Sequence, residues 1–385
     1  MEAFEVIEIL EKGEDSQHQF KRDITNAESL AGEMVAFSNT NGGIIIIGVN
    51  DNGELIGLSN DDIKRINQLV SNTATNNVKN PINPITENIK ISDALLIIVH
   101  IEDGIDKPYM DNNGVTWVKS GSDKRRVTSR EELRRLFQSS DLIHADEIPV
   151  IGSSENDIDL KYFKKFYKNQ YEEELDESNL SLIQLLNNLN LAKDNTLNLA
   201  GLLLFGKAPE KFKPSLIVKA ICFIGNDPAG DKYRDSIDIK GKLKVQYSGS
   251  IEFLKRNLKY VQKNNGINTL GEPEIPIIVL EELIVNALIH RDYFINAPIR
   301  LFVFDDRIEI ISPGRLPNNL TIENIKSGNS NIRNDVLTSF ATKELPYRGI
   351  GTGIRRAIKN YSDIDFVNDI EGEKFIVIIQ RSDNK

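Results

Sequence analysis

The sequence contains a single cysteine, which excludes an intrachain disulfide and a cysteine-based zinc site. Cys222 lies in an apolar stretch, so we expect a buried thiol. Long apolar runs are also missing, because those at 44–49 and 202–205 are far shorter than the roughly 20 residues of a membrane-spanning helix. Residues 1–15 lack the basic-then-apolar pattern of a secretory signal. We therefore expect a cytoplasmic protein that does not enter a membrane.

An excess of positive charge is missing as well, since 47 Lys and Arg stand against 57 Asp and Glu, a net charge of −10. This argues against a protein that binds nucleic acid over its whole surface. Residues 119–135 are the exception, with seven basic and three acidic residues and a local charge of +4. We expect this patch to contact nucleic acid. Its basic residues are Lys119, Lys124, Arg125, Arg126, Arg130, Arg134 and Arg135.

The length of 385 residues and 40% hydrophobic content predict two or three domains with sizeable cores. The N-terminal part predicts helices at 4–11, 27–37 and 60–76, and a buried strand at 44–49. Asn52-Gly53 is typical of a hairpin turn, with 54–58 as the partner strand. Further strands and a helix that begins after Ser129 complete a mixed sheet with helices.

Four motifs of this part occur together: GEDSQHQFK at 13–21, AFSNTNGGIIIIGVNDNG at 36–53, KPY at 107–109 and WVKSGSDKRRVTSREEL at 117–133. In combination they resemble the Schlafen/AlbA-type DNA-binding domain. The resemblance spans roughly 12–138, and we place the domain at 1–138. It implies a nucleic-acid-binding α+β domain with Lys21 as a phosphate contact beside the basic patch.

Some Schlafen relatives are RNases that hold a divalent metal with three carboxylates. Transferred here, those positions are Glu14, Gln19 and Asp51, and Glu33 is a further candidate ligand. The amide of Gln19 lacks the charge that a hard catalytic cation favours, which weakens the nuclease hypothesis. Glu14 and Asp51 are equally explained as solvated loop residues.

Residues 139–160 are polar, contain Pro149 and Gly152, and predict a linker. A middle connecting α/β domain follows at 161–269, and its LLLFGKAPEKFKP run resembles the segment that joins Schlafen/AlbA-type modules to GHKL-like modules in one bacterial family. The aromatic residues of 162–171 recur at helical spacing with lysines between them. We interpret this stripe as core with solvated lysines, although such a mixture can also stack bases.

The last third carries three motifs: EELIVNALIHRDY at 281–293, SPGRLP at 312–317 and RGIGTGI at 348–354. Glu282 and Asn286 are four residues apart on one predicted helix and so share a face, where a carboxylate and an amide suit Mg²⁺ that carries phosphates. The other two motifs are glycine loops that let the backbone approach a phosphate, and the helix after Gly353 aims its first N–H groups at an anion.

The order and spacing of these motifs resemble the GHKL ATPases, and more closely the C-terminal module of bacterial RecG-like or divergent AAA ATP-binding proteins. We place this domain, an α/β sandwich, at 270–385. The resemblance implies that Glu282 polarises the attacking water and that Asn286 holds Mg²⁺. The glycines Gly314, Gly349, Gly351 and Gly353 would line the phosphates and the base.

The chain departs from the GHKL pattern at Ser312, where the family has an aspartate that recognises the adenine amino group, so another purine ligand stays open. His290, Arg291 and Asp292 are further candidates for the nucleotide site. A guanidinium fork matches phosphate oxygens, which makes Arg291 the best phosphate candidate of the three. Alternatively, these residues form a hydrogen-bonded helix end.

Taken together, the fold class is α+β multidomain, and the expected function is nucleotide-responsive binding of DNA or RNA by a transcriptional or stress/defence regulator. ATP and Mg²⁺ are the expected ligands, with weak ATPase activity at most. A homodimer is implied by the resembled families alone. The alternatives are a metal-dependent nuclease with the C-terminal domain as sensor, and a scaffold whose nucleotide site has degenerated.

Overall fold

The structure, a computed structural model, describes residues 1–140, 142–230, 232–261, 271–317 and 320–381. The chain divides into two compact units, Met1–Ile143 and His144–Lys385. Both units combine helices with a sheet, which confirms the predicted α+β multidomain class. No helix among the described residues is long and apolar enough to span a membrane.

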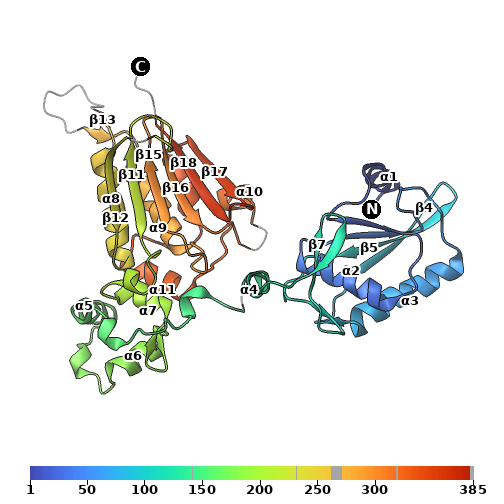
Figure 1. The fold of residues 1–385 in the computed structure, drawn as a ribbon, viewed down its shortest axis with the longest axis horizontal. Coiled ribbons are helices and arrows are strands. Elements are labelled where there is room, and N and C mark those ends of the chain that lie inside the picture. Colours follow the sequence, from blue (N-terminus) through green and yellow to red (C-terminus); the bar gives the residue numbers. More distant parts are fainter. Residues whose placement is uncertain (141, 231, 262–270, 318–319, 382–385) are drawn as a thin grey trace. The chain divides into compact units, whose positions relative to one another are not determined.

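The N-terminal unit is built on a four-stranded sheet in the order β1-β2-β5-β4, with β1 parallel to β2 and the other pairs antiparallel. Both of its faces are covered (Figure 1), because Ile45 and Ile47 pack with α2 and α3 whereas Ile46 packs with α1. This double burial explains the uninterrupted isoleucine run of β2. The strands are β1 (His18–Lys21), β2 (Gly43–Ile47), β3 (Val78–Lys79), β4 (Ile85–Ile91), β5 (Ala94–Ile101), β6 (Met110–Asp111), β7 (Trp117–Ser120) and β8 (Asp123–Arg126). The helices are α1 (Ala3–Lys12), α2 (Ala27–Asn39), α3 (Asn60–Asn76) and α4 (Arg130–Ser139).

The predicted hairpin partner of β2 is wrong. A turn does form at Asn52-Gly53, but residues 54–58 add only the single bridge between Val49 and Leu55. The antiparallel partner of β2 is β5, some fifty residues along the chain. β7 also stays outside this sheet and pairs with β8 in a two-stranded ribbon.

The C-terminal unit contains a six-stranded sheet in the order β12-β11-β15-β16-β18-β17. Only β11 and β15 run parallel. Helices α8 and α9 pack on one face of this sheet (Figure 1). Helix α12 packs against α9. The strands are β9 (Ala192–Lys193), β10 (Thr196–Leu197), β11 (Val218–Phe223), β12 (Tyr233–Ile239), β13 (Tyr260–Val261), β14 (Glu272–Pro273), β15 (Ile299–Val303), β16 (Arg307–Pro313), β17 (Ile364–Asp369) and β18 (Lys374–Gln380). The helices are α5 (Leu160–Tyr171), α6 (Leu182–Asn188), α7 (Leu199–Phe205), α8 (Leu243–Asn257), α9 (Ile277–Ile289), α10 (Ile322–Lys326), α11 (Asp335–Glu344) and α12 (Gly353–Asn360).

The segments expected to form a middle and a C-terminal domain share this unit. The boundary predicted between 269 and 270 lies outside the described residues, but β11 on one side of it pairs with β15 on the other. Part of the expected linker 139–160 is also packed, since Ala145, Val150 and Ile158 lie in the unit's core. The same core contains Phe163, Phe166 and Tyr167, which confirms that the aromatic stripe is mainly core. Because the two segments share one sheet, β11 is paired with β12 on one edge and with β15 on the other, and neither edge of β11 is exposed.

Candidate functional site

A cavity of about 110 Å³ lies in the C-terminal unit between α9, α12 and the strands β16, β17 and β18. Its lining brings together all three motifs of the last third of the sequence. Glu282 and Asn286 come from α9, Gly314 follows β16, and the second glycine loop leads into α12. The three motifs therefore line one cavity in the structure, as the sequence predicts.

Helix α9 presents two polar side chains, Glu282 and Asn286, to this cavity. Glu282 is only 6% exposed, and Asn286 lies one turn further along the same face. Among the described residues, no hydrogen-bond partner reaches the buried Nδ2 atom of Asn286. An unpaired buried donor costs about 1–3 kcal/mol, so the position is suited to a ligand that supplies an acceptor.

The second glycine loop contains two glycines that approach their neighbours closely, Gly351 and Gly353. Gly351 has a φ of +71°, and a Cβ there would lie 2.6 Å from the carbonyl oxygen of Gly328. A Cβ on Gly353 would lie 2.5 Å from Oε2 of Glu282 and 3.3 Å from Nδ2 of Asn286. The N-terminus of α12 thus sits directly against the polar face of α9, where the helix dipole favours an anion.

Arg356 is a cavity residue that the sequence analysis missed. Its guanidinium forms an ion pair with Glu282, and its Nε atom is buried with no hydrogen-bond partner among the described residues. The helix that follows Gly353 was expected, but its sequence does not distinguish Arg355 from Arg356. Only the packing of α12 on α9 decides which arginine faces the carboxylate.

The remaining predicted residues of this motif separate in space. His290 lines the cavity, and its Nε2 lies 3.3 Å from the hydroxyl oxygen of Tyr347. Arg291 is outside the lining and 1% exposed, and it donates to the carbonyl oxygens of Ser215 and Ala297. Asp292 is also outside the lining and accepts from the backbone N–H of Phe294 at 2.9 Å. The structure thus gives Arg291 a structural position in place of the expected phosphate contact.

Ser312 lies on the floor of the cavity at the end of β16. Its hydroxyl donates to the carbonyl oxygen of Ala287 at 3.2 Å, which satisfies a carbonyl near the C-terminus of α9. The hydroxyl oxygen of Ser312 keeps its lone pairs, so Ser312 can accept a hydrogen bond from a ligand.

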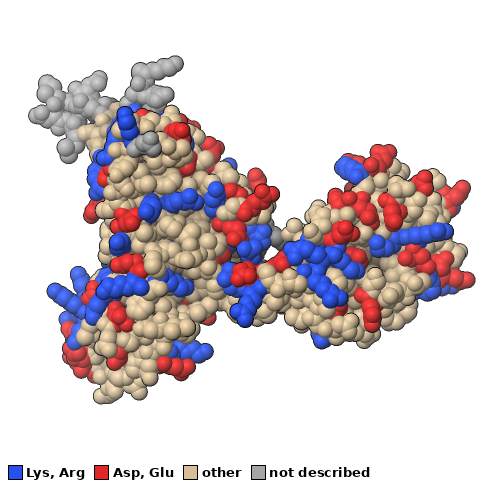
Figure 2. All heavy atoms as spheres, in the orientation of Figure 1, with Lys and Arg blue, Asp and Glu red and all other residues tan. Residues whose placement is uncertain are grey.

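The basic patch of the N-terminal unit is partly neutralised by its own neighbours. Figure 2 shows Lys and Arg side chains gathered near β7. Arg125 is paired with Glu132, and Lys124 donates to Glu33 at 3.1 Å. Arg126 lies over the Trp117 ring at 5.2 Å, and both Arg126 and Arg130 are exposed. Both guanidinium groups are therefore open to an approaching phosphate.

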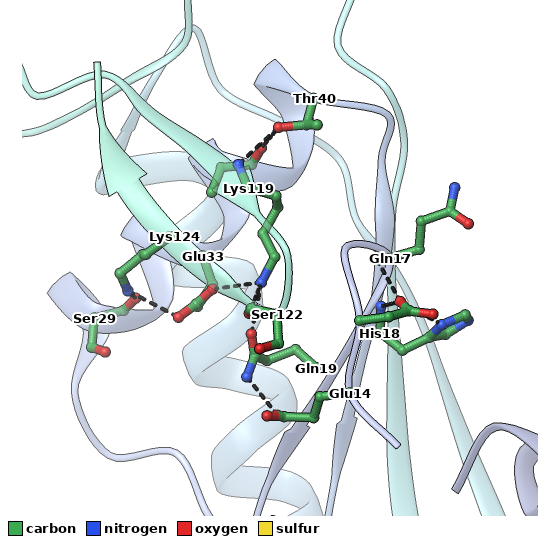
Figure 3. A network of polar contacts seen from close by, with 12 residues as sticks. Glu14, Gln17, His18, Gln19, Ser29, Glu33, Thr40, Lys119, Ser122 and Lys124 are labelled. Atoms are coloured by element: carbon green, nitrogen blue, oxygen red, sulfur yellow. Dashed lines mark hydrogen bonds and ion pairs between the residues drawn. The ribbon is translucent and has the colours of Figure 1, made fainter. Parts of the chain in front are cut away.

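Lys119, predicted to bind nucleic acid, is instead enclosed within the unit (Figure 3). Its ammonium donates to Oε1 of Gln19 at 2.8 Å and to the carbonyl oxygen of Ser122, and it lies 3.8 Å from Oε2 of Glu33. Burial lowers the pKa of Lys119, and the carboxylates of Glu33 and Glu14 oppose that shift. The prediction of a surface contact is wrong because alternation along β7 turns this side chain inward, onto the polar side chains beneath the ribbon.

Of the proposed nuclease ligands, Glu14, Gln19 and Glu33 belong to one polar network around the Lys119 ammonium (Figure 3), and no contact described for the chain joins Asp51 to that network. Oε1 of Glu14 accepts from the side chain of Gln19 at 2.5 Å and from the backbone N–H of Phe20 at 2.6 Å, while Asp51 lies in an exposed turn. The described part of the chain has no cluster of three His, Cys, Asp or Glu residues suited to a metal. A lysine ammonium occupies the space between Gln19 and Glu33 (Figure 3).

Comparisons with known proteins match both ends of the chain. Residues 14–128 match the family model "Schlafen, AlbA_2", and residues 296–378 match "Putative ATP-dependent DNA helicase recG C-terminal". The chain joins a Schlafen/AlbA_2 domain to a RecG-like C-terminal domain. The comparison with curated proteins gave no match.

Two solved structures show weak likenesses. The DIP2311 protein from Corynebacterium diphtheriae is 20% identical with a TM-score of 0.45, over 95% of this chain and 76% of that one. The N-terminal domain of a RecG-related protein from Nitrosomonas europaea is 19% identical with a TM-score of 0.26, over 34% of this chain and 96% of that one.

The RecG-like match begins after α9, so it includes Gly314 and the second glycine loop but neither Glu282 nor Asn286. The assignment of those two residues to the site therefore rests on the cavity geometry. In the same way, the Schlafen/AlbA_2 match includes Arg126 but ends before Arg130.

His290 gives the cavity a measurable pH signature. Burial and the nearby charge of Arg333 lower the pKa of His290 to about 4, whereas an unfolded histidine titrates near 6.5. Between these values the unfolded chain binds a proton that the folded chain does not, so stability falls as the pH drops from about 6.5 to 4. Between pH 7 and pH 5, we expect the free energy of unfolding to fall by about 1–2 kcal/mol more in the unaltered protein than in His290→Asn.

The free energies of unfolding are measured by urea titration of the unaltered protein and His290→Asn at pH 7 and pH 5, with circular dichroism as the signal. Burial also raises the pKa of Asp146 to about 6, which stabilises the folded state as the pH falls over much of the same interval. This effect is common to both proteins, so the contribution of His290 is the difference between them. An equal loss in both proteins would show that His290 is protonated in the folded cavity.

Proposed function

We propose that this chain is a nucleotide-responsive nucleic-acid-binding protein with a regulatory role in transcription, stress or defence, and that its nucleotide is ATP with Mg²⁺. The observation that carries the proposal is the cavity in which α9 and both glycine loops meet around the unpaired Nδ2 of Asn286. The family matches support the coarser statement of nucleic-acid-related and ATPase-type domains.

The residues present fit a magnesium-bound polyphosphate. The side chains of Asn286 and Arg356 each have a buried donor that lacks a partner among the described residues, and together with the N-terminus of α12 they favour an anion. Asn286 would hold Mg²⁺ through its amide oxygen, and the ion would neutralise phosphate charge when bound. Glu282 is the proposed base, but its pairing with Arg356 favours binding over rapid hydrolysis.

A chain of contacts links the cavity to the start of the C-terminal unit. Arg333 follows the cavity-lining residues 329–331 and donates to the carbonyl oxygens of His290 at 3.3 Å and Arg315 at 2.8 Å. Nearby, Leu337 donates its backbone N–H to Asp146 at 2.9 Å. In the proposed mechanism, nucleotide shifts the described residues of the segment from Pro313 to Gly351, and these contacts carry the change to the residues that follow the N-terminal unit in sequence. Pairing of two chains belongs to the same proposal.

A thermal-shift series with ATP and Mg²⁺ tests the nucleotide part of the proposal. A ligand that binds the folded state alone raises the melting temperature with concentration, and about 2.7 kcal/mol is gained at 100 times Kd. For a unit of this size we expect a shift of roughly 5–10 °C. A flat series up to millimolar ATP would instead support the degenerate scaffold.

For the N-terminal unit we expect nucleic-acid binding without cleavage. Glu14 is already engaged by Gln19 and the backbone of Phe20, and Lys119 supplies the positive charge between Gln19 and Glu33. Purified protein should therefore leave tRNA and single-stranded DNA intact in Mg²⁺ or Mn²⁺, and Asp51→Ala should bind them as the unaltered protein does. Cleavage that disappears in Asp51→Ala would establish the nuclease alternative.

A further inference from the structure

Arg356 and Glu282 form an ion pair inside the cavity, at the point where α12 begins against α9. The side chains are 23% and 7% exposed, so both charges are largely withdrawn from water. Such a pair costs desolvation, and it persists when each charge has no better partner in reach. In the cavity a phosphate is a better partner for a guanidinium, because its oxygens match the planar fork and carry more charge.

The guanidinium of Arg356 is incompletely used in its present position. Its Nε atom is buried without a hydrogen-bond partner among the described residues, as is Nδ2 of Asn286 on the facing helix. Gly353 lies against the polar face of α9, since a Cβ there would approach both Glu282 and Asn286. Glu282 therefore lies among the N-terminus of α12 and two side chains, Asn286 and Arg356, whose donors lack a partner among the described residues. The proposed function places the carboxylate of Glu282 at the attacking water, next to the terminal phosphate.

We propose that Arg356 distinguishes a nucleoside triphosphate from a diphosphate, and that the terminal phosphate takes its guanidinium away from Glu282. This inference rests on the proposed function. With a diphosphate the ion pair stays intact, and Glu282 keeps its oxygen on the guanidinium. With a triphosphate the pair opens, and the carboxylate is free to accept a hydrogen bond from water. The same exchange makes Arg356 both the sensor of the terminal phosphate and the restraint on Glu282.

Arg355 provides a matched control on the same helix. It is exposed and lies outside the cavity lining, and its Cδ atom would lie 3.1 Å from a Cβ on Gly328. Arg355→Gln and Arg356→Gln remove the same charge from adjacent positions. A difference between them reports the contact that only Arg356 makes with the site.

The experiment is isothermal titration of the full chain with ADP and with a non-hydrolysable ATP analogue, both in Mg²⁺. We expect the unaltered protein and Arg355→Gln to prefer the triphosphate by tenfold or more. Arg356→Gln should lose about tenfold in affinity for the triphosphate and stay within about twofold for ADP. Glu282→Gln should bind the triphosphate several-fold more tightly than the unaltered protein, because no ion pair has to open.

Equal losses for both nucleotides in Arg356→Gln, or an unchanged preference, would overturn the role of Arg356 while leaving nucleotide binding in place. Absence of binding by the unaltered protein would overturn the proposed function together with this inference. Thermal unfolding of each variant without ligand checks that the fold is retained, and Glu282→Gln supplies a second test that does not depend on Arg356→Gln folding.

Discussion

Asn286→Ala loses nearly all the stabilisation that ATP and Mg²⁺ give to the chain. The variant removes the unpaired Nδ2 atom and the proposed magnesium ligand from the polar face of α9. A hydrogen bond to a charged group contributes about 1.5–3 kcal/mol, and loss of a metal contact adds to this. We therefore expect a fall in ATP affinity of about 100-fold, which reduces the melting shift at a fixed, moderate ATP concentration to roughly 1 °C or less.

Asn188→Ala is the control for this measurement, since Asn188 is an exposed asparagine at the end of α6 and lies outside the cavity lining. Its ATP shift should equal that of the unaltered protein. A large shift that survives in Asn286→Ala would show that nucleotide binds elsewhere in the chain.

Reversing two charges of the N-terminal patch has the second large effect. In the double variant Arg126→Glu and Arg130→Glu, two exposed cations become anions, whereas Arg125 and Lys124 stay with their carboxylate partners. On a single strand each lost phosphate contact lowers the salt slope by about 0.7, which corresponds to about fivefold in affinity at 0.1 M salt. We expect at least about 25-fold weaker binding to single-stranded DNA or RNA in fluorescence anisotropy, with a salt slope smaller by about 1.4.

The matched control reverses two exposed lysines of α5, Lys161→Glu and Lys165→Glu. Both double variants change the net charge equally, so a non-specific effect of charge would weaken both alike. Equal weakening would contradict the assignment of the patch, and unchanged binding in the Arg126 and Arg130 variant would place the nucleic-acid surface elsewhere.

Local patterns in the sequence predicted the elements of the fold but not all of their partners. The run at 44–49 predicts a buried strand because isoleucine alone covers both of its faces. Asn52-Gly53 does mark a turn, yet β2 pairs with β5, and a turn signal carries no information about a partner fifty residues away. For the same reason, the pairing of β11 with β15 across a predicted domain boundary was not foreseeable.

The candidate site was predictable where spacing decides it. The four-residue interval places Glu282 and Asn286 on one helical face, and the glycines mark where the backbone lines the cavity. Arg291 was chosen by residue type alone, and the structure buries its guanidinium among backbone carbonyls. Arg356 was missed and Lys119 misplaced for a common reason: their partners, Glu282 and Glu33, lie far along the chain, and only tertiary packing brings the charges together.

The proposed control of nucleic-acid binding by nucleotide is measured in one titration. The affinity of the full chain for a single-stranded oligonucleotide is measured by anisotropy with and without saturating ATP and Mg²⁺. We expect nucleotide to change this affinity by about fivefold or more, the usual lower range of coupling between two sites, and to leave the affinity of Asn286→Ala unchanged. Identical affinities with and without nucleotide, under conditions where ATP is bound, would contradict the proposed control.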